Sequence, residues 1–324
     1  MTETVFRNAR IVLPDAIVEG DLVVRDGLVA EVSPAGTGTV ALDVEGDWLV
    51  PGLVELHTDH LEGHYAPRPK VRWNPVAAVQ AHDAQIASSG ITTVFDALRV
   101  GMDEDTDLGS DDMARLADAI VEAQAAGRLR ADHFIHLRCE VCAPDVIESF
   151  GKLEANRRVR LASLMDHTPG QRQFTSMETY RLYYQGKTGM TDAEFEAFVA
   201  KRQARAGALS GANRRVISAR CQERGIIVAS HDDASTSHVD EAIENGVHVA
   251  EFPTTFEAAE ASRAAGMKIL MGAPNVVRGG SHSGNVSARA LAERGLLDVL
   301  SSGYLPFSLP HAPFLMPERG AGMT

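Results

Sequence analysis

The chain has 324 residues, of which 44% are hydrophobic and 23% are charged, an ordinary globular composition with ample apolar material for a large core. A net charge of −13 and a pI of about 5.4 argue against a surface for nucleic acid or anionic membrane, so we expect neither kind of partner. A small anionic substrate is compatible with this charge, because a few arginines and bound metal ions can invert the sign locally.

The cysteines and the N-terminus indicate the compartment. Three cysteines, Cys139, Cys142 and Cys221, are too few and odd in number for a disulfide framework and fit a reducing cytosol. The first residues show no basic segment followed by an apolar run, and no stretch approaches about 18 uncharged apolar residues, so we expect no signal peptide and no transmembrane helix. These features predict a cytoplasmic protein.

The first elements in chain order predict a small β domain over residues 1–51. Residues 4–13 are β-branched and apolar, as in a strand. Residues 20–32 are typical of a hairpin that turns at Asp26-Gly27, a favoured two-residue turn.

After Pro51-Gly52 the pattern changes to short apolar runs that alternate with helical segments. Such alternation implies a parallel sheet, and about eight strands over roughly 250 residues favour a closed (β/α)8 barrel of the TIM type. We therefore predict an α/β fold in which residues 52–324 form the barrel. The predicted strands cover residues 53–56, 92–95, 132–138, 158–165, 226–230, 247–251, 268–271 and 298–301, and predicted helices include 75–89, 111–127, 239–245 and 256–266.

Residues 180–215 form a long and charged insertion after the strand that ends near Met165. The composition predicts that most of this insertion is helical. Two interpretations stay open for it, a lid over the active site or a solvated helix pair.

Imidazole and carboxylate groups follow several predicted strands at the points where these strands end. His57 and Asp59 follow the first of them, and Glu140, His167 and His231 each follow a later one. Functional groups of a parallel barrel lie at the C-terminal ends of its strands. A lone His-x-Asp is more often a capping feature, but the joint pattern indicates a site for Zn²⁺, Mn²⁺ or Fe²⁺.

The cysteines have a simpler interpretation. Cys139 and Cys142 match the Cys-x-x-Cys spacing of redox and zinc motifs. At a strand end, residues three apart point to opposite faces, so we do not expect them to share a metal. Cys221 lies in a helical run and is predicted to be a core residue.

Longer segments carry a resemblance to a known family. The segment WLVPGLVELHTDHLEGHYAPRP resembles the amidohydrolase superfamily, in which a Pro-Gly pair, an acidic residue and a His-x-His motif lead to the end of the first barrel strand. More narrowly, the chain resembles the triphosphate diphosphatases of phosphonate utilisation, from about residue 5 to about residue 309. The other matching segments are SSGITTVFDAL, HLRCEV, LMDHTPGQRQF, VASHDDAS, EFPTTFEAA and APNVVRGGSHSGNVSA.

This resemblance implies a site for two divalent metal ions, which would activate a bridging water and clamp phosphoryl oxygens. His57 and Asp59 stand for the metal-binding pair of the first strand. Glu140 stands where many relatives have a carboxylated lysine that bridges the metals. His167 and His231 stand for histidines of the fifth and sixth strands.

The resemblance also implies a reaction, the hydrolysis of α-D-ribose 1-methylphosphonate 5-triphosphate. Water attacks the phosphoryl group nearest the ribose, diphosphate leaves, and the 5-phosphate remains. The predicted catalytic carboxylates are Glu140 and Asp232.

A phosphorylated sugar of this kind is a polyanion, so its site needs hydrogen-bond donors. Arginine forks match phosphate oxygens bidentately, and adjacent glycines let backbone N–H groups approach an anion. Any single arginine is more often a surface charge, but the polar loop at 279–285 follows a barrel strand and is expected to face the active site. The predicted substrate-binding residues are His60, Arg68, Arg138, Arg172, Arg278, Ser281, His282 and Ser283.

Two features depart from the family pattern. The family carries an Asp at the end of the eighth strand that binds a metal and accepts a proton, and Gly303 stands there in this chain. Asp298 lies five residues earlier, at the wrong end of the strand. The family also continues through an eighth helix, whereas this chain ends at Thr324 after a proline-rich stretch that forbids a regular helix, so we expect a truncated C-terminus with an incomplete eighth helix.

Two other functions stay open beside the diphosphatase. An amidohydrolase acting on a C–N bond, such as a phospho-sugar deacetylase or a deaminase, would use the same barrel, although the arginines and the polar loop count against it. A metal-binding but catalytically impaired barrel is favoured by Gly303. The sequence also leaves a homo-oligomer open.

Overall fold

A computed structural model describes residues 2–34, 41–102, 108–172, 177–281 and 284–316. The chain divides into two compact units, the first within Met1–Gly52 and the second within Leu53–Pro317. Within the described residues, no helix is long and apolar enough to span a membrane.

The first unit is a small β sheet. β1 (Glu3–Val12) pairs antiparallel with β2 (Ile17–Arg25), which pairs antiparallel with β3 (Leu28–Ser33). The turn between β2 and β3 is formed by Asp26 and Gly27, both with positive φ, so the predicted hairpin is confirmed. The short strands β4 (Leu42–Asp43) and β5 (Trp48–Leu49) run parallel to β1, and a small apolar cluster forms around Ala9, Ile11 and Leu22.

The second unit is a barrel of eight parallel strands that follow one another in chain order. A parallel bridge between Thr58 and Gly303 joins the first strand to the segment after the last, so the sheet closes. The predicted TIM-type barrel is therefore confirmed. The strands are β6 (Leu53–Thr58), β7 (Ile91–Val100), β8 (Asp132–Glu140), β9 (Val159–Met165), β10 (Ile227–His231), β11 (Val249–Glu251), β12 (Lys268–Gly272) and β13 (Val299–Ser301).

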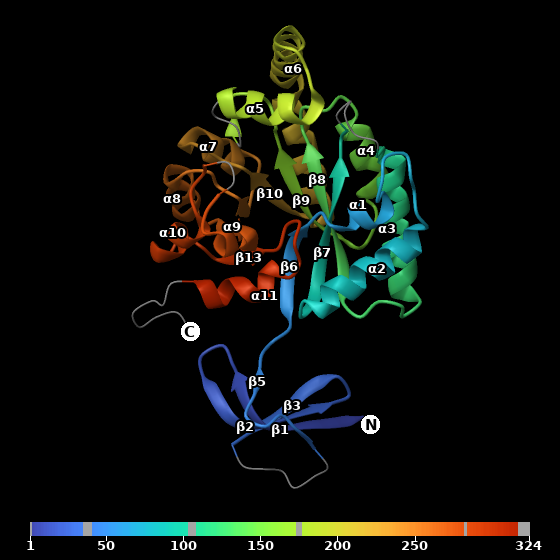
Figure 1. The fold of residues 1–324 in the computed structure, drawn as a ribbon, viewed down its shortest axis with the longest axis vertical. Helices are drawn as coiled ribbons and strands as arrows, with labels where there is room; N and C mark the ends of the chain where they lie inside the picture. Colours follow the sequence, from blue (N-terminus) through green and yellow to red (C-terminus); the bar gives the residue numbers. More distant parts are fainter. Residues whose placement is uncertain (1, 35–40, 103–107, 173–176, 282–283, 317–324) are drawn as a thin grey trace. The chain divides into compact units, whose positions relative to one another are not determined.

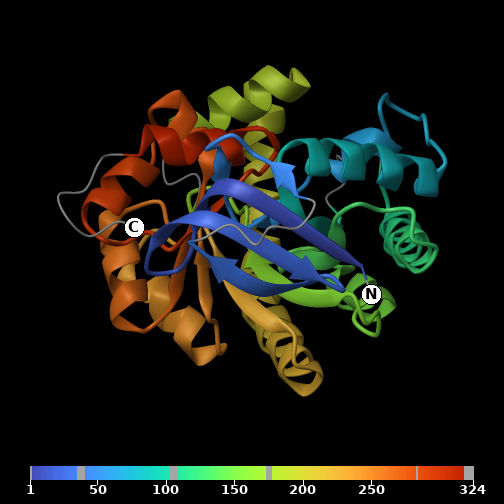
Figure 2. The same ribbon diagram turned by 90° about the horizontal axis from the view of Figure 1, so that it is seen from below.

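Helices surround these strands on the outside (Figures 1 and 2). Local signals set their ends: Asn74 accepts a hydrogen bond from the backbone N–H of Ala77 at the start of α2, and Thr191 forms a capping box with Glu194 at the start of α6. The helices are α1 (Leu61–Tyr65), α2 (Pro75–Ser88), α3 (Ser110–Ala125), α4 (Val146–Leu153), α5 (Met177–Thr188), α6 (Asp192–Arg224), α7 (Thr236–Glu244), α8 (Phe256–Ala264), α9 (Ala273–Arg278), α10 (Ala288–Glu293), α11 (Ser308–His311) and the 3₁₀ helix η2 (Ala312–Leu315).

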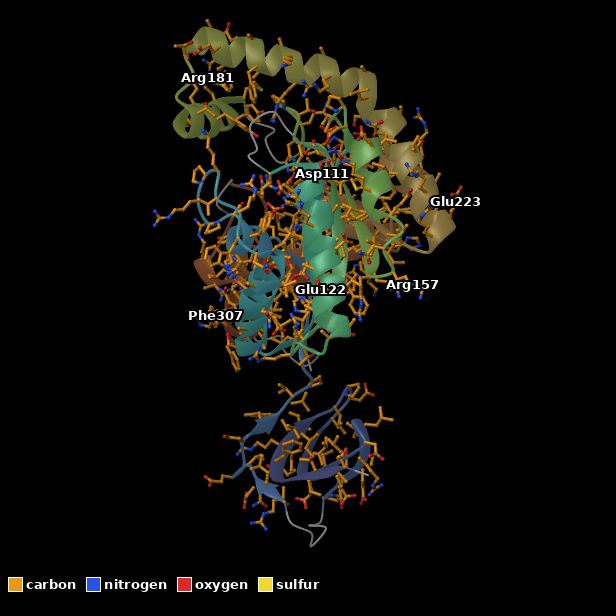
Figure 3. The ribbon with its side chains drawn as sticks, turned by 90° about the vertical axis from the view of Figure 1, so that its right-hand side faces the viewer. Asp111, Glu122, Arg157, Arg181, Glu223 and Phe307 are labelled. Atoms are coloured by element: carbon orange, nitrogen blue, oxygen red, sulfur yellow. The ribbon has the colours of Figure 1, made fainter. Side chains whose placement is uncertain are left out.

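The insertion after β9 is helical, as predicted, but it is longer than residues 180–215. α6 continues without a break to Arg224, a length of 33 residues, and crosses the end of the barrel beside α5 (Figure 3). Its C-terminal half buries Ile217 and Cys221, so this half serves as an ordinary barrel helix and Cys221 is a core residue as predicted. After β13 the described chain forms only the short α11 and η2, as the prolines in this stretch predict.

Candidate metal centre

Two histidines at the C-terminal ends of β6 and β10 are held by one buried carboxylate. The Nδ1 atoms of His57 and His231 each lie 3.2 Å from a different oxygen of Glu251, the last residue of β11. Burial alone would raise the pKa of Glu251, but His57 and His136 hold it well below its ordinary value. A carboxylate only accepts hydrogen bonds, so both Nδ1 atoms carry protons and both Nε2 atoms keep a lone pair. Metal-binding histidines are commonly oriented in this way.

A second carboxylate–imidazole pair lies beside the first. Oε2 of Glu140, at the end of β8, is 2.5 Å from Nδ1 of His167, whose backbone N–H also donates to Oε1. Burial opposes charge on both groups, but each favours charge on the other, so the pKa of Glu140 is lowered and the pKa of His167 is raised. The ring centroid of His167 is 5.9 Å from that of His231, which joins the two pairs into one cluster.

Asp232 completes this cluster. The carboxylate is buried, and its Oδ2 has no hydrogen-bond partner although it lies 3.4 Å from Nε2 of His231. Its backbone φ is +56°, a left-handed conformation that costs free energy in a residue other than glycine. Ligand atoms of His167, His231 and Asp232 all lie within 4.8 Å of one another. A buried carboxylate oxygen without a donor is costly, and a cation would satisfy it.

Asp59 connects the cluster to an arginine. Its Oδ2 accepts a hydrogen bond of 3.1 Å from Nη1 of Arg138 on β8. Burial alone would raise the pKa of Asp59, but Arg138 and His57 lower it below its ordinary value. The Nε atom of Arg138 is buried without a hydrogen-bond partner. This arginine is therefore fixed by Asp59 and still has a donor to offer.

Most of these groups line one cavity of about 240 Å³ at the C-terminal ends of the barrel strands. The cavity also reaches Gly303, where a Cβ atom would meet no other atom within 4 Å. The metal-binding and anion-binding candidates that line it are His57, Asp59, His231, Asp232, Arg138, Arg278 and Ser281. Glu140 and His167 adjoin it through the ring contact with His231.

The donor set fits a divalent metal. Imidazole Nε2 atoms with free lone pairs stand beside ionised carboxylates, which is the nitrogen and oxygen chemistry that Zn²⁺ and its neighbours prefer. The buried Oδ2 of Asp232, which has no hydrogen-bond partner, fits a cation site beside it. Of the five predicted metal ligands, His57, Asp59 and His231 line this cavity, whereas Glu140 and His167 line a small separate pocket.

The predicted strand assignment of two histidines is wrong. His167 follows β9, the fourth barrel strand, and His231 ends β10, the fifth. The sixth strand, β11, ends in Glu251, a residue that no motif in the sequence indicates. The predicted strands 158–165 and 226–230 are themselves the fourth and fifth in chain order, so the error lies in the family assignment and not in the predicted strands. Glu251 is the last residue of the predicted strand 247–251, and this position was the available signal.

The predicted substrate-binding residues are only partly brought together. Arg138, Arg278 and Ser281 line the cavity. Arg68 is exposed and His60 bonds to Gln85 on α2 at 2.8 Å, and neither lines it. His282 and Ser283 lie outside the described residues.

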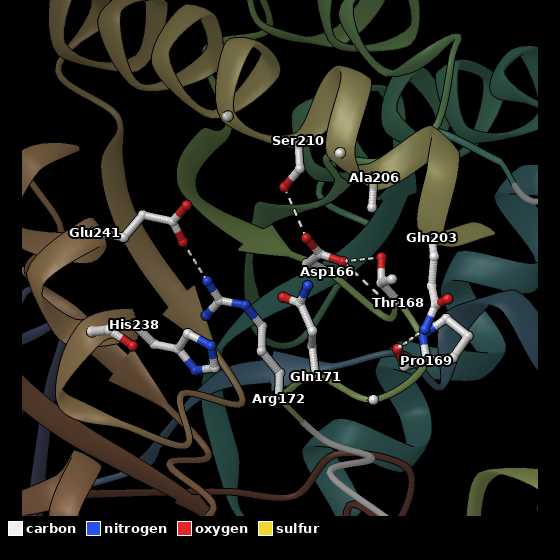
Figure 4. Close-up of a pocket in the computed structure, with 14 residues that line it drawn as sticks. Asp166, Thr168, Pro169, Gln171, Arg172, Gln203, Ala206, Ser210, His238 and Glu241 are labelled. Carbon is white, nitrogen blue, oxygen red and sulfur yellow. Dashed lines mark hydrogen bonds and ion pairs between the residues drawn. The ribbon is translucent and has the colours of Figure 1, made fainter. Parts of the chain in front are cut away.

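Arg172 also lies elsewhere. It lines a separate cavity of about 580 Å³ between the loop after β9 and helices α6 and α7 (Figure 4). Its guanidinium is buried and forms ion pairs with Asp233 and Glu241. The prediction that Arg172 shares a cavity with Arg278 is therefore wrong, because two carboxylates hold its side chain away from the metal cluster.

Cys139 and Cys142 have different partners. The thiol of Cys139 faces the carbonyl of Leu137 at 3.7 Å. The thiol of Cys142 lies 3.0 Å from Oε1 of Glu140 and 3.1 Å from Oδ1 of Asp166. Cys142 is thus a neighbour of the metal cluster, and burial raises the pKa of its thiol well above the ordinary range.

Solved structures share this architecture. An uncharacterized metal-dependent hydrolase from Pyrococcus horikoshii OT3 matches with a TM-score of 0.60 and 10% identity over 97% of this chain and 85% of its own. A second from Pyrococcus furiosus matches with a TM-score of 0.57 and 12% identity over 93% and 85%. An amidohydrolase from an environmental sample of the Sargasso Sea matches with a TM-score of 0.51 and 15% identity over 96% of this chain and 71% of its own.

These three structures share the barrel fold of this chain. No family model matches the chain. The alpha-D-ribose 1-methylphosphonate 5-triphosphate diphosphatase of Escherichia coli (strain K12) is 49% identical over 311 residues, which are 96% of this chain and 82% of that relative. The chain belongs to this diphosphatase family, and the resemblance inferred from its sequence motifs is confirmed.

Proposed function

We propose that this chain hydrolyses α-D-ribose 1-methylphosphonate 5-triphosphate to the 5-phosphate and diphosphate. The observation that carries the proposal is a cavity that joins a metal-binding cluster to arginines, since Arg138 and Arg278 line it together with His57, His231 and Asp232. Within the described residues, no ion pair of Arg278 is found, so its charge is available to an anion. The relative that is 49% identical bears the name of this activity.

We further propose that the site holds two divalent ions, Zn²⁺, Mn²⁺ or Fe²⁺. The ligands would be His57, Asp59, Glu140, His167 and His231, which come from the ends of four barrel strands and are therefore held on a rigid scaffold. Bound ions would polarise a phosphoryl oxygen and increase the acidity of water. Glu251 orients two of these ligands through its hydrogen bonds to His57 and His231.

The residues of the chain then have separate tasks in the reaction. Arg138, Arg278 and Ser281 bind the phosphate oxygens and place the phosphorus nearest the ribose beside the cluster. Asp232 accepts the proton of the attacking water through its unpaired Oδ2. The new P–O bond forms as the P–O bond to the diphosphate breaks. The electron pair leaves with the diphosphate, whose charge the arginines stabilise.

The proposed setting is the cytoplasm, with a small phosphorylated sugar as the substrate. Cys139, Cys142 and Cys221 are all buried and unpaired, as expected for a reducing compartment. A site lined by arginines selects a phosphorylated substrate over a neutral amide. This favours the diphosphatase over a C–N hydrolase that acts on a neutral substrate.

The test is diphosphate release from the ribose triphosphate by the metal-loaded chain. We expect Asp232→Asn to lower kcat by roughly 10²–10⁴-fold, the usual contribution of a positioned acid or base. Asp240→Asn is the matched control, because Asp240 is an exposed carboxylate on α7. The proposal is wrong if the metal-loaded chain releases no diphosphate, or if the two variants are equally active.

A further inference from the structure

Four histidines cluster outside the cavity, between α1, α2 and strands β7 and β8. His60 is the N-cap residue of α1, and His64 lies four residues further on within this helix, so both stand on one side of it. Their Nε2 atoms lie 2.8 and 3.2 Å from the same atom, Oε1 of Gln85 on α2. His82 precedes Gln85 by three residues and lies on the same face of α2. Both Nε2 atoms donate to this amide oxygen, so two ring nitrogens converge on one point beside a third imidazole, and a metal bound there would replace their two protons.

The three rings form a triangle of suitable size for one metal ion. The centroid distances are 5.0 Å between His60 and His64, 6.1 Å between His60 and His82, and 5.9 Å between His64 and His82. Zn–N bonds of about 2.0–2.1 Å at tetrahedral angles put the centroids of bound imidazoles about 5 Å apart. The three centroid distances are therefore within about 1 Å of those of imidazoles that share a metal ion.

His82 is prepared as a ligand by a carboxylate behind it. Nε2 of His82 donates to Oδ1 of Asp96 at 2.8 Å, and both side chains are completely buried. The proton is thereby fixed on Nε2, and Nδ1 keeps its lone pair. Nδ1 of His82 is buried and has no hydrogen-bond partner. A carboxylate that orients the far nitrogen of a histidine is the usual support of a metal-bound imidazole.

The fourth histidine, His133, has a different role. Its Nδ1 lies 2.8 Å from Oδ2 of Asp96 and its Nε2 lies 3.4 Å from Oδ1 of Asp83. Burial opposes its charge, but the two carboxylates raise the pKa of His133 to about 9. Both ring nitrogens carry protons, so this ring has no lone pair for a metal. It neutralises Asp96 instead.

We propose that His60, His64 and His82 bind a further divalent cation, Zn²⁺ by preference, with Gln85 or water as the fourth ligand. The site is distinct from the catalytic cluster, since none of its side chains lines the cavity. His60 and His64 are only partly buried, so an ion can enter from solvent. A metal here would tie α1 to α2 directly after Asp59, and so hold the segment that presents Asp59 to Arg138.

Metal content of the full chain tests this proposal, and diphosphate release is not its readout. The chain is dialysed against buffered Zn²⁺ and the bound metal is measured by mass spectrometry. We expect His64→Gln to lose about one equivalent per chain relative to the unaltered protein. His248→Gln is the matched control, because His248 is an exposed histidine outside both clusters and should keep the full content.

A second variant gives a new absorption band, which loss of folded protein cannot produce. His64→Cys supplies a thiolate ligand, and Co²⁺ at the site should then add a thiolate-to-cobalt absorption band that the unaltered chain lacks. Loss of one equivalent in His64→Gln together with the new band supports the site. Unchanged zinc content in a natively folded His64→Gln, or no new band in His64→Cys, overturns it. Failure of the diphosphatase proposal would leave both readouts unaffected.

Discussion

At the scale of single residues, Glu251 organises the candidate metal centre. Its two oxygens accept from His57 and His231, so one side chain sets the tautomer of both rings. Glutamine has only one accepting atom, and its amide N–H would oppose the other histidine. We expect Glu251→Gln to weaken metal binding by roughly 10–100-fold. Competition with a chelator measures this, and Glu260→Gln, an exposed glutamate, should bind metal as the unaltered chain does; equal affinities would contradict the positioning role.

Arg278 and Arg68 allow a cavity arginine to be compared with a surface arginine. Arg278 lines the cavity, whereas Arg68 is exposed and does not. A charge-assisted hydrogen bond contributes about 1.5–3 kcal/mol, so Arg278→Ala should raise KM for the triphosphate by roughly tenfold or more. Arg68→Ala should leave KM unchanged. Diphosphate should also inhibit the Arg278→Ala variant less than the unaltered chain, and it should inhibit the unaltered chain less at high salt than at low salt. Identical constants for both variants would show that Arg278 does not meet the substrate.

Gly303 offers a gain-of-function test. Its φ is +60°, there is space for a Cβ atom, and the residue lines the cavity. Aspartate tolerates this backbone better than most residues, and the strain of about 1–2 kcal/mol is an upper limit to the cost. We expect Gly303→Asp to raise diphosphate release by at least roughly tenfold, because it supplies an acid/base group.

Gly303→Asn is the control for this test, since it has nearly the same shape without the charge. If both variants are as active as the chain with glycine, the end of the eighth strand has no catalytic role here. Asp232 would then be sufficient as the proton acceptor. If only the aspartate variant is active, the chain with Gly303 is the catalytically impaired barrel.

At the scale of elements, Glu55 closes the barrel between its first and last strands. Its Oε1 accepts from the backbone N–H of His57 at 2.7 Å and its Oε2 from that of Ser302 at 2.5 Å. Glutamine can accept only one of these bonds and would leave a buried N–H without a partner. We expect Glu55→Gln to lower the free energy of unfolding by about 1–3 kcal/mol in urea titrations. Glu122→Gln, an exposed change on α3, should have no effect (Figure 3); a loss of equal size there would remove the special role of Glu55.

The eight strands were predictable from sequence because each is a short apolar run, and burial on both faces requires this. β9, for example, is buried at every position except Arg160. The strand ends then predicted His57, Glu140 and His231, since a parallel barrel places its functional groups there.

Other parts of the site depend on contacts between distant segments, which no local pattern records. Arg172 matches a phosphate-binding arginine in its local sequence, but Asp233 and Glu241, more than sixty residues away, neutralise it. His60 was expected at the substrate, yet Gln85 on the next helix binds it. A lone glutamate at a strand end also gives no sign that it will face two histidines, so Glu251 was overlooked.

At the scale of the whole molecule, the metal should stabilise the barrel and leave the small sheet unchanged. The candidate ligands all belong to the unit within Leu53–Pro317, whereas the unit within Met1–Gly52 has its own apolar cluster. Without a cation, Oδ2 of Asp232 is buried in the barrel without a hydrogen-bond partner. A buried oxygen of this kind opposes folding of the barrel and has no bearing on the small sheet.

Removal of the metal should therefore destabilise the barrel by a definite amount and leave the small sheet unaffected. A ligand at about 100 times its Kd stabilises by about 2.7 kcal/mol, so chelation should lower the Tm of the barrel by roughly 5 °C. Hydrogen exchange should become faster in β6, β10 and β11, while exchange in the paired β1 and β2 stays the same. Chelator saturated with Ca²⁺ is the control for effects of the reagent itself. Faster exchange in both units, or in neither, would mean that the cluster at the strand ends does not hold a stabilising metal.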